Sequence, residues 1–267
     1  MIEKITSATN EKIKKAVSLK EKKYRDNCGL FTGEGVRFSE MAISSDFEIV
    51  SVFFEPKILE NDRGKNLIES LEKSLKKNSI KLYETNERVM QKLSNTKTPQ
   101  GVFLVIKQKN YSLKNIANSK IFVILDNVRD PGNAGTIIRL SDAIGVGAVM
   151  FTKNSVDAYS DKVIRATMGS IFHIPVLQNI DKTSIIDFAK SQNLKIYATK
   201  MNAPICYEQD LKNGGIFIFG SESEGVSAEF SNIAHNISLP IIGKAESLNV
   251  ASAASALLYE VYRQQNY

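Results

Sequence analysis

The sequence predicts an α/β protein with two domains, on three observations. Short runs of β-branched and aromatic residues alternate with segments whose apolar residues recur at helical spacing. The stretch at 108–119 is polar and rich in Lys, Asn and Ser, a composition typical of a connector. The 267 residues also exceed the roughly 100–200 residues of an ordinary domain. We therefore expect a first domain over 1–107, a linker over 108–119 and a second domain over 120–267.

In the first domain, the segment 10–24 predicts a basic amphipathic helix, because its apolar residues recur at helical spacing and lysines fill the other faces. A second helix is expected around 67–75, opened by the turn sequence NDRG. Strands are expected at 49–56, 80–85 and 101–108, which are rich in β-branched and aromatic residues. This alternation is typical of a small α/β domain.

The second domain continues the alternation with more strongly apolar strands. Helices are expected at 133–144, 161–169, 185–189 and 248–264, with a short one after 220, and strands at 121–125, 148–151, 171–176, 195–199, 216–220 and 237–241. Apolar strands between helices indicate a parallel sheet that is covered on both faces. Because such sheets bind ligands outside the carboxyl ends of their strands, we expect the functional residues in the loops there.

The charge distribution suggests a polyanionic partner. The formal net charge is +6, and residues 1–25 hold eight Lys/Arg against three Glu, a local charge of +5. Such a segment either contacts phosphates or is a solvated helix face, and its composition leaves both interpretations open.

Several protein classes are disfavoured by composition. No run approaches the roughly 18 apolar residues of a membrane span, and the first 15 residues lack the apolar stretch of a signal peptide. The cysteines Cys28 and Cys206 show neither a disulfide framework nor the spacing of a zinc site. We expect a cytoplasmic protein with no membrane segment and no metal.

Two segments of the second domain carry polar residues at the start of a helix. In LDNVRDPGNAGTIIR, Asn133 suits an N-cap and Arg139 lies nearly two turns further along. In SLNVASAAS, Ser247 and Asn249 open the terminal helix. Capping and surface exposure alone would also account for these residues.

A third loop, FGSESEGVS, is rich in glycine and glutamate. Gly220 and Gly225 have the spacing of a Walker A loop, but Val226 stands where that pattern needs Lys, which argues against nucleotide hydrolysis. No G-x-G-x-x-G follows a strand, so a dinucleotide site is not supported either. The glycines allow a ligand to approach the backbone, and Glu222 or Glu224 can accept hydrogen bonds.

Together, NAGTIIR, FGSESEG and LPIIGKAESLNVASAASALLYE resemble the three signature motifs of the SpoU/TrmH family of RNA 2′-O-ribose methyltransferases, within the SPOUT superfamily. FTGEGVRFSEMAI and TKTPQGVFLVI resemble the ends of the small ribosomal-protein-like α/β domain that often precedes the catalytic domain and binds the RNA substrate. Gly33 departs from this pattern, because relatives tend to carry an apolar residue there.

The resemblance implies S-adenosylmethionine as methyl donor, bound in a C-terminal SPOUT domain whose parallel sheet contains a deep trefoil knot. It also implies a homodimer that forms through the terminal helix, where small residues allow close approach. The implied cofactor-binding residues are Thr199, Gly220, Leu239, Ile241 and Leu248.

The resemblance further implies which residues act on the ribose 2′-hydroxyl. Asn133 would orient the hydroxyl, and Arg139 either acts as a base or stabilises charge. We favour stabilisation of a phosphate and a developing alkoxide, because a guanidinium stays protonated in proteins. Glu222 would orient Arg139 or neighbouring backbone through charge-assisted hydrogen bonds, while Ser247 and Asn249 would face the cofactor and the hydroxyl as well as opening the helix.

The expected partner is RNA, held by basic residues of the first domain. The two-domain layout resembles the branch that acts on ribosomal RNA, so 23S rRNA is the expected substrate. A tRNA 2′-O-methyltransferase and a catalytically inactive RNA-binding relative are the alternatives. The expected RNA contacts are Lys12, Lys15, Lys22, Lys23, Arg25 and Arg37.

Overall fold

The computed structural model describes residues 2–75, 80–116 and 119–267, which form two compact units. The first unit comprises Met1–Lys109 and Tyr159–Phe172, and the second comprises Asn110–Ala158 and His173–Tyr267. The division after Lys109 falls inside the expected linker, of which residues 117–118 lie outside the described residues. The segment Tyr159–Phe172 packs with the first unit, although in sequence it belongs to the range 120–267.

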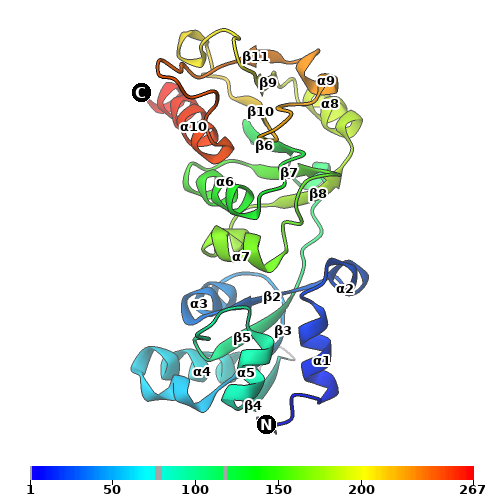
Figure 1. The fold of residues 1–267 in the computed structure, drawn as a ribbon, viewed down its shortest axis with the longest axis vertical. Helices are drawn as coiled ribbons and strands as arrows, with labels where there is room; N and C mark the ends of the chain where they lie inside the picture. The colour runs from blue at the N-terminus through cyan, green and yellow to red at the C-terminus, as the bar shows by residue number, and fades with distance from the viewer. Residues whose placement is uncertain (1, 76–79, 117–118) are drawn as a thin grey trace. The chain divides into compact units, whose positions relative to one another are not determined.

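The first unit is built on a five-stranded mixed sheet with the order β1-β4-β3-β5-β2 (Figure 1). Strand β5 is antiparallel to both of its neighbours, and the other pairs are parallel. The strands are β1 Glu3–Ile5, β2 Leu30–Glu34, β3 Ile49–Phe54, β4 Lys81–Thr85 and β5 Val102–Lys107. The helices are α1 Glu11–Ser18, α2 Lys22–Cys28, α3 Val36–Ser44, α4 Asp62–Leu75, α5 Glu87–Leu93 and α7 Asp161–Thr167, with 3-10 turns at Pro56–Glu60 and Ser170–Phe172.

The basic helix expected over 10–24 is two helices, so this prediction was wrong in detail. Helix α1 ends at Ser18, and α2 begins at Lys22 after Glu21 adopts an extended conformation. The guanidinium of Arg25 turns back and donates to the carbonyl oxygens of Leu19 and Lys20 at 2.7 and 2.8 Å. These bonds satisfy carbonyls that the end of α1 leaves without helical partners.

Gly33, which departs from the family pattern, has a packing reason in this chain. A Cβ at Gly33 would lie 1.9 Å from the ring of Phe38, so the aromatic side chain occupies the space of the missing one. Phe38 in turn packs against Phe172 with ring centroids 4.9 Å apart.

The second unit is built on a six-stranded sheet with the order β11-β9-β10-β6-β7-β8, in which every pair is parallel as expected. Helices α6 and α10 cover one face, and α8 and α9 cover the other (Figure 1). The strands are β6 Ile121–Asp126, β7 Ala148–Thr152, β8 Val176–Ile180, β9 Ile196–Thr199, β10 Gly215–Gly220 and β11 His235–Ile237. The helices are α6 Pro131–Ala143, α8 Lys182–Ser191, α9 Ala228–Ser231 and α10 Val250–Asn266, with 3-10 turns at Leu113–Ile116 and Cys206–Glu208.

Two expected strands of this domain are misplaced. The apolar run at 171–176 begins as a 3-10 turn, because Phe172 packs on Phe38 and Phe47 of the first unit, and β8 starts only at Val176. The strand expected at 237–241 ends at Ile237. Pro240 has no N–H to give to a sheet, so the chain continues there as an irregular segment.

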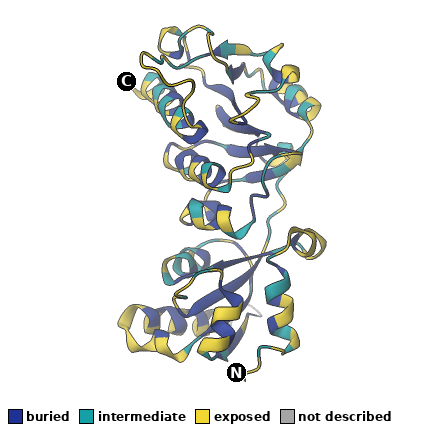
Figure 2. Ribbon diagram, viewed as in Figure 1, coloured by how far each residue is buried: buried dark blue, intermediate teal, exposed yellow. Residues whose placement is uncertain are grey.

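The central strands of both sheets are among the most buried parts of the molecule (Figure 2). In the second unit, β6 and β10 are buried along their whole length. Within the described ranges, no helix is long and apolar enough to cross a membrane.

Candidate functional site

Three polar segments meet beside the carboxyl ends of β6 and β10. They are the start of α6, the loop of residues 221–226 (the β10 loop) and the turn before α10. Because all strands of the sheet are parallel, their carboxyl ends lie at one edge, and segments far apart in sequence come together there.

Helix α6 begins at Pro131, two residues before the start expected from its apolar pattern. Asp130 is the N-cap, and its side chain accepts a hydrogen bond from the backbone N–H of Asn133 at 2.7 Å. Pro131 occupies the first helical position, where no N–H is needed. Asn133 is therefore not the N-cap, contrary to expectation, and its side chain is left free to bond outside the helix.

The Asn133 amide joins the three segments. Its Nδ2 donates to Oε1 of Glu222, and its Oδ1 accepts from Nδ2 of Asn249 at 2.9 Å. The Oδ1 of Asn249 also accepts the backbone N–H groups of Ala251 and Ser252, at 3.0 and 3.2 Å, and so caps α10. The chain Glu222–Asn133–Asn249 fixes the orientation of the Asn133 amide from both sides.

Two expected roles differ from this arrangement. Glu222 was expected to orient Arg139 or neighbouring backbone, and its carboxylate instead accepts from the side chain of Asn133. Arg139 is exposed on α6, and within the part of the chain that the structure describes its guanidinium makes no hydrogen bond or ion pair. Ser247 is exposed two residues before the cap, so it does not cap α10.

A pocket of about 480 Å³ opens beside this chain of side chains. It is lined by the ends of β9 and β10, the β10 loop, the segment before α10 and the inner face of α10. The expected cofactor residues Thr199, Gly220, Leu239, Ile241 and Leu248 all line it, as do the expected catalytic residues Glu222 and Ser247. Its volume lies in the range of small-molecule sites, about 300–1,000 Å³.

The β10 loop folds back tightly over the end of its strand. The N–H of Gly225, at φ 69°, donates to the carbonyl of Ser221 at 2.9 Å. A Cβ at Gly220 would lie 2.0 Å from the carbonyl carbon of Gly225 and 2.1 Å from the nitrogen of Val226, so no larger residue fits there. The loop conformation therefore requires glycine at the end of the strand.

The pocket has apolar walls that are incompletely covered. Leu248 is 42% exposed, and Leu239 and Ile241 are half-buried on the irregular segment that follows β11. Cys206 also lines the pocket, and burial raises the pKa of its thiol to about 11. Apolar side chains left open around a pocket are suited to contact an apolar ligand. Among the described residues, no group of three or more His, Cys, Asp or Glu is placed to hold a metal ion.

The expected RNA contacts of the first unit fall into three groups. Lys15, Lys22, Lys23 and Arg37 are exposed. Lys12 forms an ion pair with Glu3, 2.5 Å from its Oε2. Arg25 is only 4% exposed and donates to backbone carbonyls, so it is not placed to contact RNA, contrary to expectation.

These features place the second unit among the α/β domains that bind a small molecule at the carboxyl edge of a parallel sheet. The chain belongs to the SpoU rRNA methylase family, whose model matches residues 120–259, so the resemblance of its motifs is confirmed. The MRM3-like substrate binding domain matches residues 10–104.

Relatives cover nearly the whole chain. It is 32% identical over 262 residues to the 23S rRNA (guanosine(2553)-2′-O)-methyltransferase RlmP of Bacillus subtilis strain 168, a match that spans 97% of this chain and 99% of that protein. The crystal structure of an AdoMet-bound rRNA methyltransferase from Sinorhizobium meliloti is similar with a TM-score of 0.90 and 28% identity, over 100% of this chain and 99% of that one. The crystal structure of an RNA 2′-O ribose methyltransferase is similar with a TM-score of 0.83 and 30% identity, over 99% and 100%.

Proposed function

We propose that this protein transfers a methyl group from S-adenosylmethionine to a ribose 2′-hydroxyl of ribosomal RNA, with 23S rRNA as the substrate. The observation that carries the proposal is the hydrogen-bonded chain Glu222–Asn133–Asn249 beside a small-molecule pocket. Family membership and the name of the Bacillus relative support both the reaction and the substrate.

The pocket residues fit S-adenosylmethionine. Leu239, Ile241 and Leu248 offer apolar surface to an adenine, and Gly220 lets the ligand approach backbone atoms. Glu222 and Glu224 add carboxylates to the same lining, which suit a ligand that carries a positive sulfur. When bound, the cofactor supplies an electrophilic methyl group on a sulfonium.

The chain's own residues would prepare the hydroxyl. Glu222 and Asn249 each occupy one end of the Asn133 amide, so its remaining N–H and lone pair have fixed directions and can orient a ribose hydroxyl. Arg139 is exposed and carries a full charge, so it can hold an RNA phosphate and stabilise a developing alkoxide. Ser247 contributes a further hydroxyl from the pocket lining.

The first unit would hold the RNA. Its exposed cations Lys15, Lys22, Lys23 and Arg37 can contact phosphates, while none of the three motifs lies in this unit. The proposed RNA-binding domain spans 1–107, the linker 108–119 and the methyltransferase domain 120–267.

We further propose a homodimer that forms through α10. Tyr259 and Tyr262 are 52% and 36% exposed on this helix, and Ile242 in the segment before it is 98% exposed. A second copy of the chain would cover this apolar surface. The trefoil knot and action in the cytoplasm stay predictions.

The direct test maps 2′-O-methylated nucleotides in total RNA from cells with and without the gene. The proposal predicts that one methylated position in 23S rRNA disappears without the gene. Loss of a tRNA position instead would overturn the substrate, and an unchanged map would overturn the function.

A further inference from the structure

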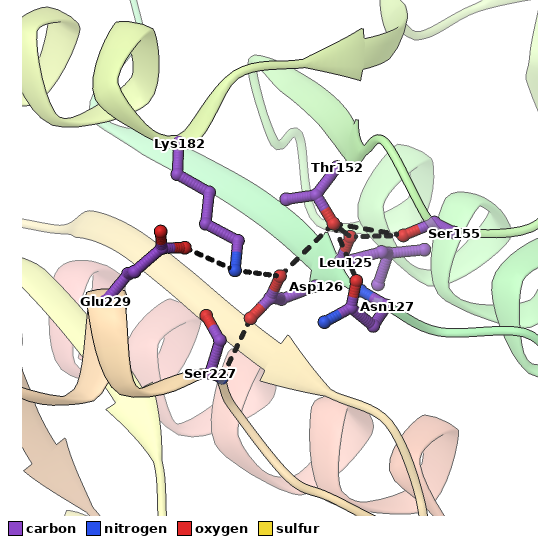
Figure 3. Close-up of polar contacts among 8 residues, drawn as sticks. All are labelled: Leu125, Asp126, Asn127, Thr152, Ser155, Lys182, Ser227 and Glu229. Atoms are coloured by element: carbon purple, nitrogen blue, oxygen red, sulfur yellow. Dashed lines mark hydrogen bonds and ion pairs between the residues drawn. The ribbon is translucent and has the colours of Figure 1, made fainter.

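The last residue of β6, Asp126, is a fully buried carboxylate outside the pocket described above. Its side chain is 0% exposed and points to the face of the sheet that α8 and α9 cover (Figure 3). A buried charge is costly unless it is paired and hydrogen-bonded, so its partners indicate what it does.

Asp126 has three partners from three different elements. Its Oδ2 accepts the backbone N–H of Ser227 at 2.9 Å, and its Oδ1 accepts the hydroxyl of Thr152 at 3.2 Å. The ammonium of Lys182, at the start of α8, lies 3.7 Å from Oδ1 and also pairs with Glu229 at 2.7 Å (Figure 3).

A second pocket, of about 430 Å³, opens beside this cluster, but its charges do not suit RNA phosphates. Both lysines in its lining are engaged: Lys182 as described, and Lys153 with Asp181 at 2.7 Å. With Asp126 beneath them, three carboxylates face two ammonium groups. The cluster is therefore better explained by what it holds in place than by an anion that it binds.

The position of Asp126 connects it to both ends of the β10 loop. In the sheet register Asp126 pairs with Gly220, the residue from which the loop departs. Its side chain binds the N–H of Ser227, the residue at which the loop ends. Between these two points the loop carries Glu222 and contributes lining to the pocket.

We propose that Asp126 is a positioning residue that holds the β10 loop in its cofactor-binding conformation. This inference rests on the proposed use of the pocket for S-adenosylmethionine. A loop fixed at both ends has less conformational freedom to lose when a ligand binds, so the anchor favours affinity. Lys182 and Thr152 contact Oδ1 and hold the carboxylate in place, so that Oδ2 faces the N–H of Ser227.

Two variants test the anchor from its two sides. Asp126→Asn keeps the shape but removes the charge, and Ser227→Pro removes the N–H at a residue whose φ of −59° proline adopts readily. We expect the dissociation constant for S-adenosylmethionine to rise about fivefold for Asp126→Asn and about tenfold for Ser227→Pro, which matches the net contribution of about one typical hydrogen bond. The KM for the cofactor should rise in parallel, while kcat at saturating cofactor stays within about threefold.

The control is Ser155→Ala, at the same end of the sheet. Ser155 donates to the carbonyl of Leu125 at 2.8 Å and lies 3.4 Å from the hydroxyl of Thr152, but it has no bond to Asp126 or the β10 loop. Its loss leaves the bond from Thr152 to Asp126 in place, so it should lower stability without changing cofactor affinity. Calorimetry on the full chain measures affinity, and circular dichroism checks that each variant is folded.

The outcomes separate the two claims. If the wild-type chain binds no S-adenosylmethionine, the proposed function fails. If it binds and both folded variants bind within twofold of it, the anchor is refuted while the proposed function stands. Should Asp126→Asn not fold, Ser227→Pro alone decides, because it leaves the buried strand unchanged. A loss of kcat with unchanged cofactor KM would also contradict the anchor.

Discussion

Asn249 has two roles that a single substitution can separate. Its Oδ1 caps α10 by accepting two backbone N–H groups, and its Nδ2 donates to Asn133 at 2.9 Å. In Asn249→Asp, a carboxylate oxygen can still accept both N–H groups, and its charge is favourable at the N-terminus of a helix, by about 0.3–1 kcal/mol. The substitution removes the Nδ2 donor to Asn133, and a carboxylate oxygen of residue 249 then faces the Oδ1 of Asn133.

The expected effects follow from these contacts. Stability should stay the same or rise slightly in Asn249→Asp, whereas Asn249→Ala should lose roughly 0.5–2 kcal/mol with the cap. Removing the bond to Asn133 costs about 0.5–1.5 kcal/mol, and the facing oxygens add repulsion. We therefore expect single-turnover methyl transfer by Asn249→Asp to slow at least tenfold, which corresponds to about 1.4 kcal/mol.

The assay uses labelled cofactor with excess enzyme, beside thermal unfolding of each variant. Asn86→Asp is the matched control in the first unit. Asn86 caps α5 by accepting the N–H of Val89, and its Nδ2 donates to the carbonyl of Thr6, so it has the same two kinds of bond as Asn249. Its methyl transfer should be unchanged. If Asn249→Asp transferred methyl at the wild-type rate, Asn249 would be a helix cap and nothing more.

Three further predictions use the same assays and simple chemistry. Arg139→Ala should lower kcat on the order of 10²–10³-fold with cofactor affinity retained, and Arg139→Lys should restore it only in part; a rate within a few-fold of wild type would remove the arginine from the mechanism. Cys28 is exposed and should react with thiol reagents at pH 8, whereas Cys206 is buried with a thiol pKa of about 11 and should be protected; equal rates for both thiols would contradict this. Because folding raises the pKa of Cys206, the stability that its protonated thiol contributes should be present below pH 9 and lost as the pH rises toward 11. Lys23→Gln should weaken RNA binding and reduce its salt dependence. Arg25→Gln should instead lower the free energy of unfolding by about 1–3 kcal/mol, because the carbonyls of Leu19 and Lys20 lose their donor. Weaker RNA binding by Arg25→Gln with unchanged melting would make Arg25 an RNA contact.

The sequence correctly predicted the strands whose side chains are all buried, because a continuous apolar run marks them. The runs at 121–125, 148–151 and 216–220 are apolar throughout, and they form the buried centre of a parallel sheet. The three polar segments also met at one edge, since parallel strands leave few other places for them.

The errors arose where a tertiary contact overrides a local pattern. The run at 171–176 is apolar because Phe172 packs against other aromatic rings, so composition alone could not distinguish it from a strand. The break between α1 and α2 depends on Arg25, whose charge suggests a surface residue. Asp126 was overlooked as well, although an acid at the end of a fully apolar run is a signal in itself.

Alkaline hydrolysis of the labelled RNA distinguishes methyl transfer to a ribose hydroxyl from transfer to a base. The purified protein is incubated with labelled S-adenosylmethionine and 23S rRNA transcript, with a tRNA pool in parallel, and the labelled RNA is hydrolysed in alkali. A methylated 2′-hydroxyl cannot attack the adjacent phosphate, so the account predicts label in an alkali-resistant dinucleotide from 23S rRNA. Label in ordinary mononucleotides would place the methyl group on a base, and no label in any RNA would contradict methyl transfer altogether.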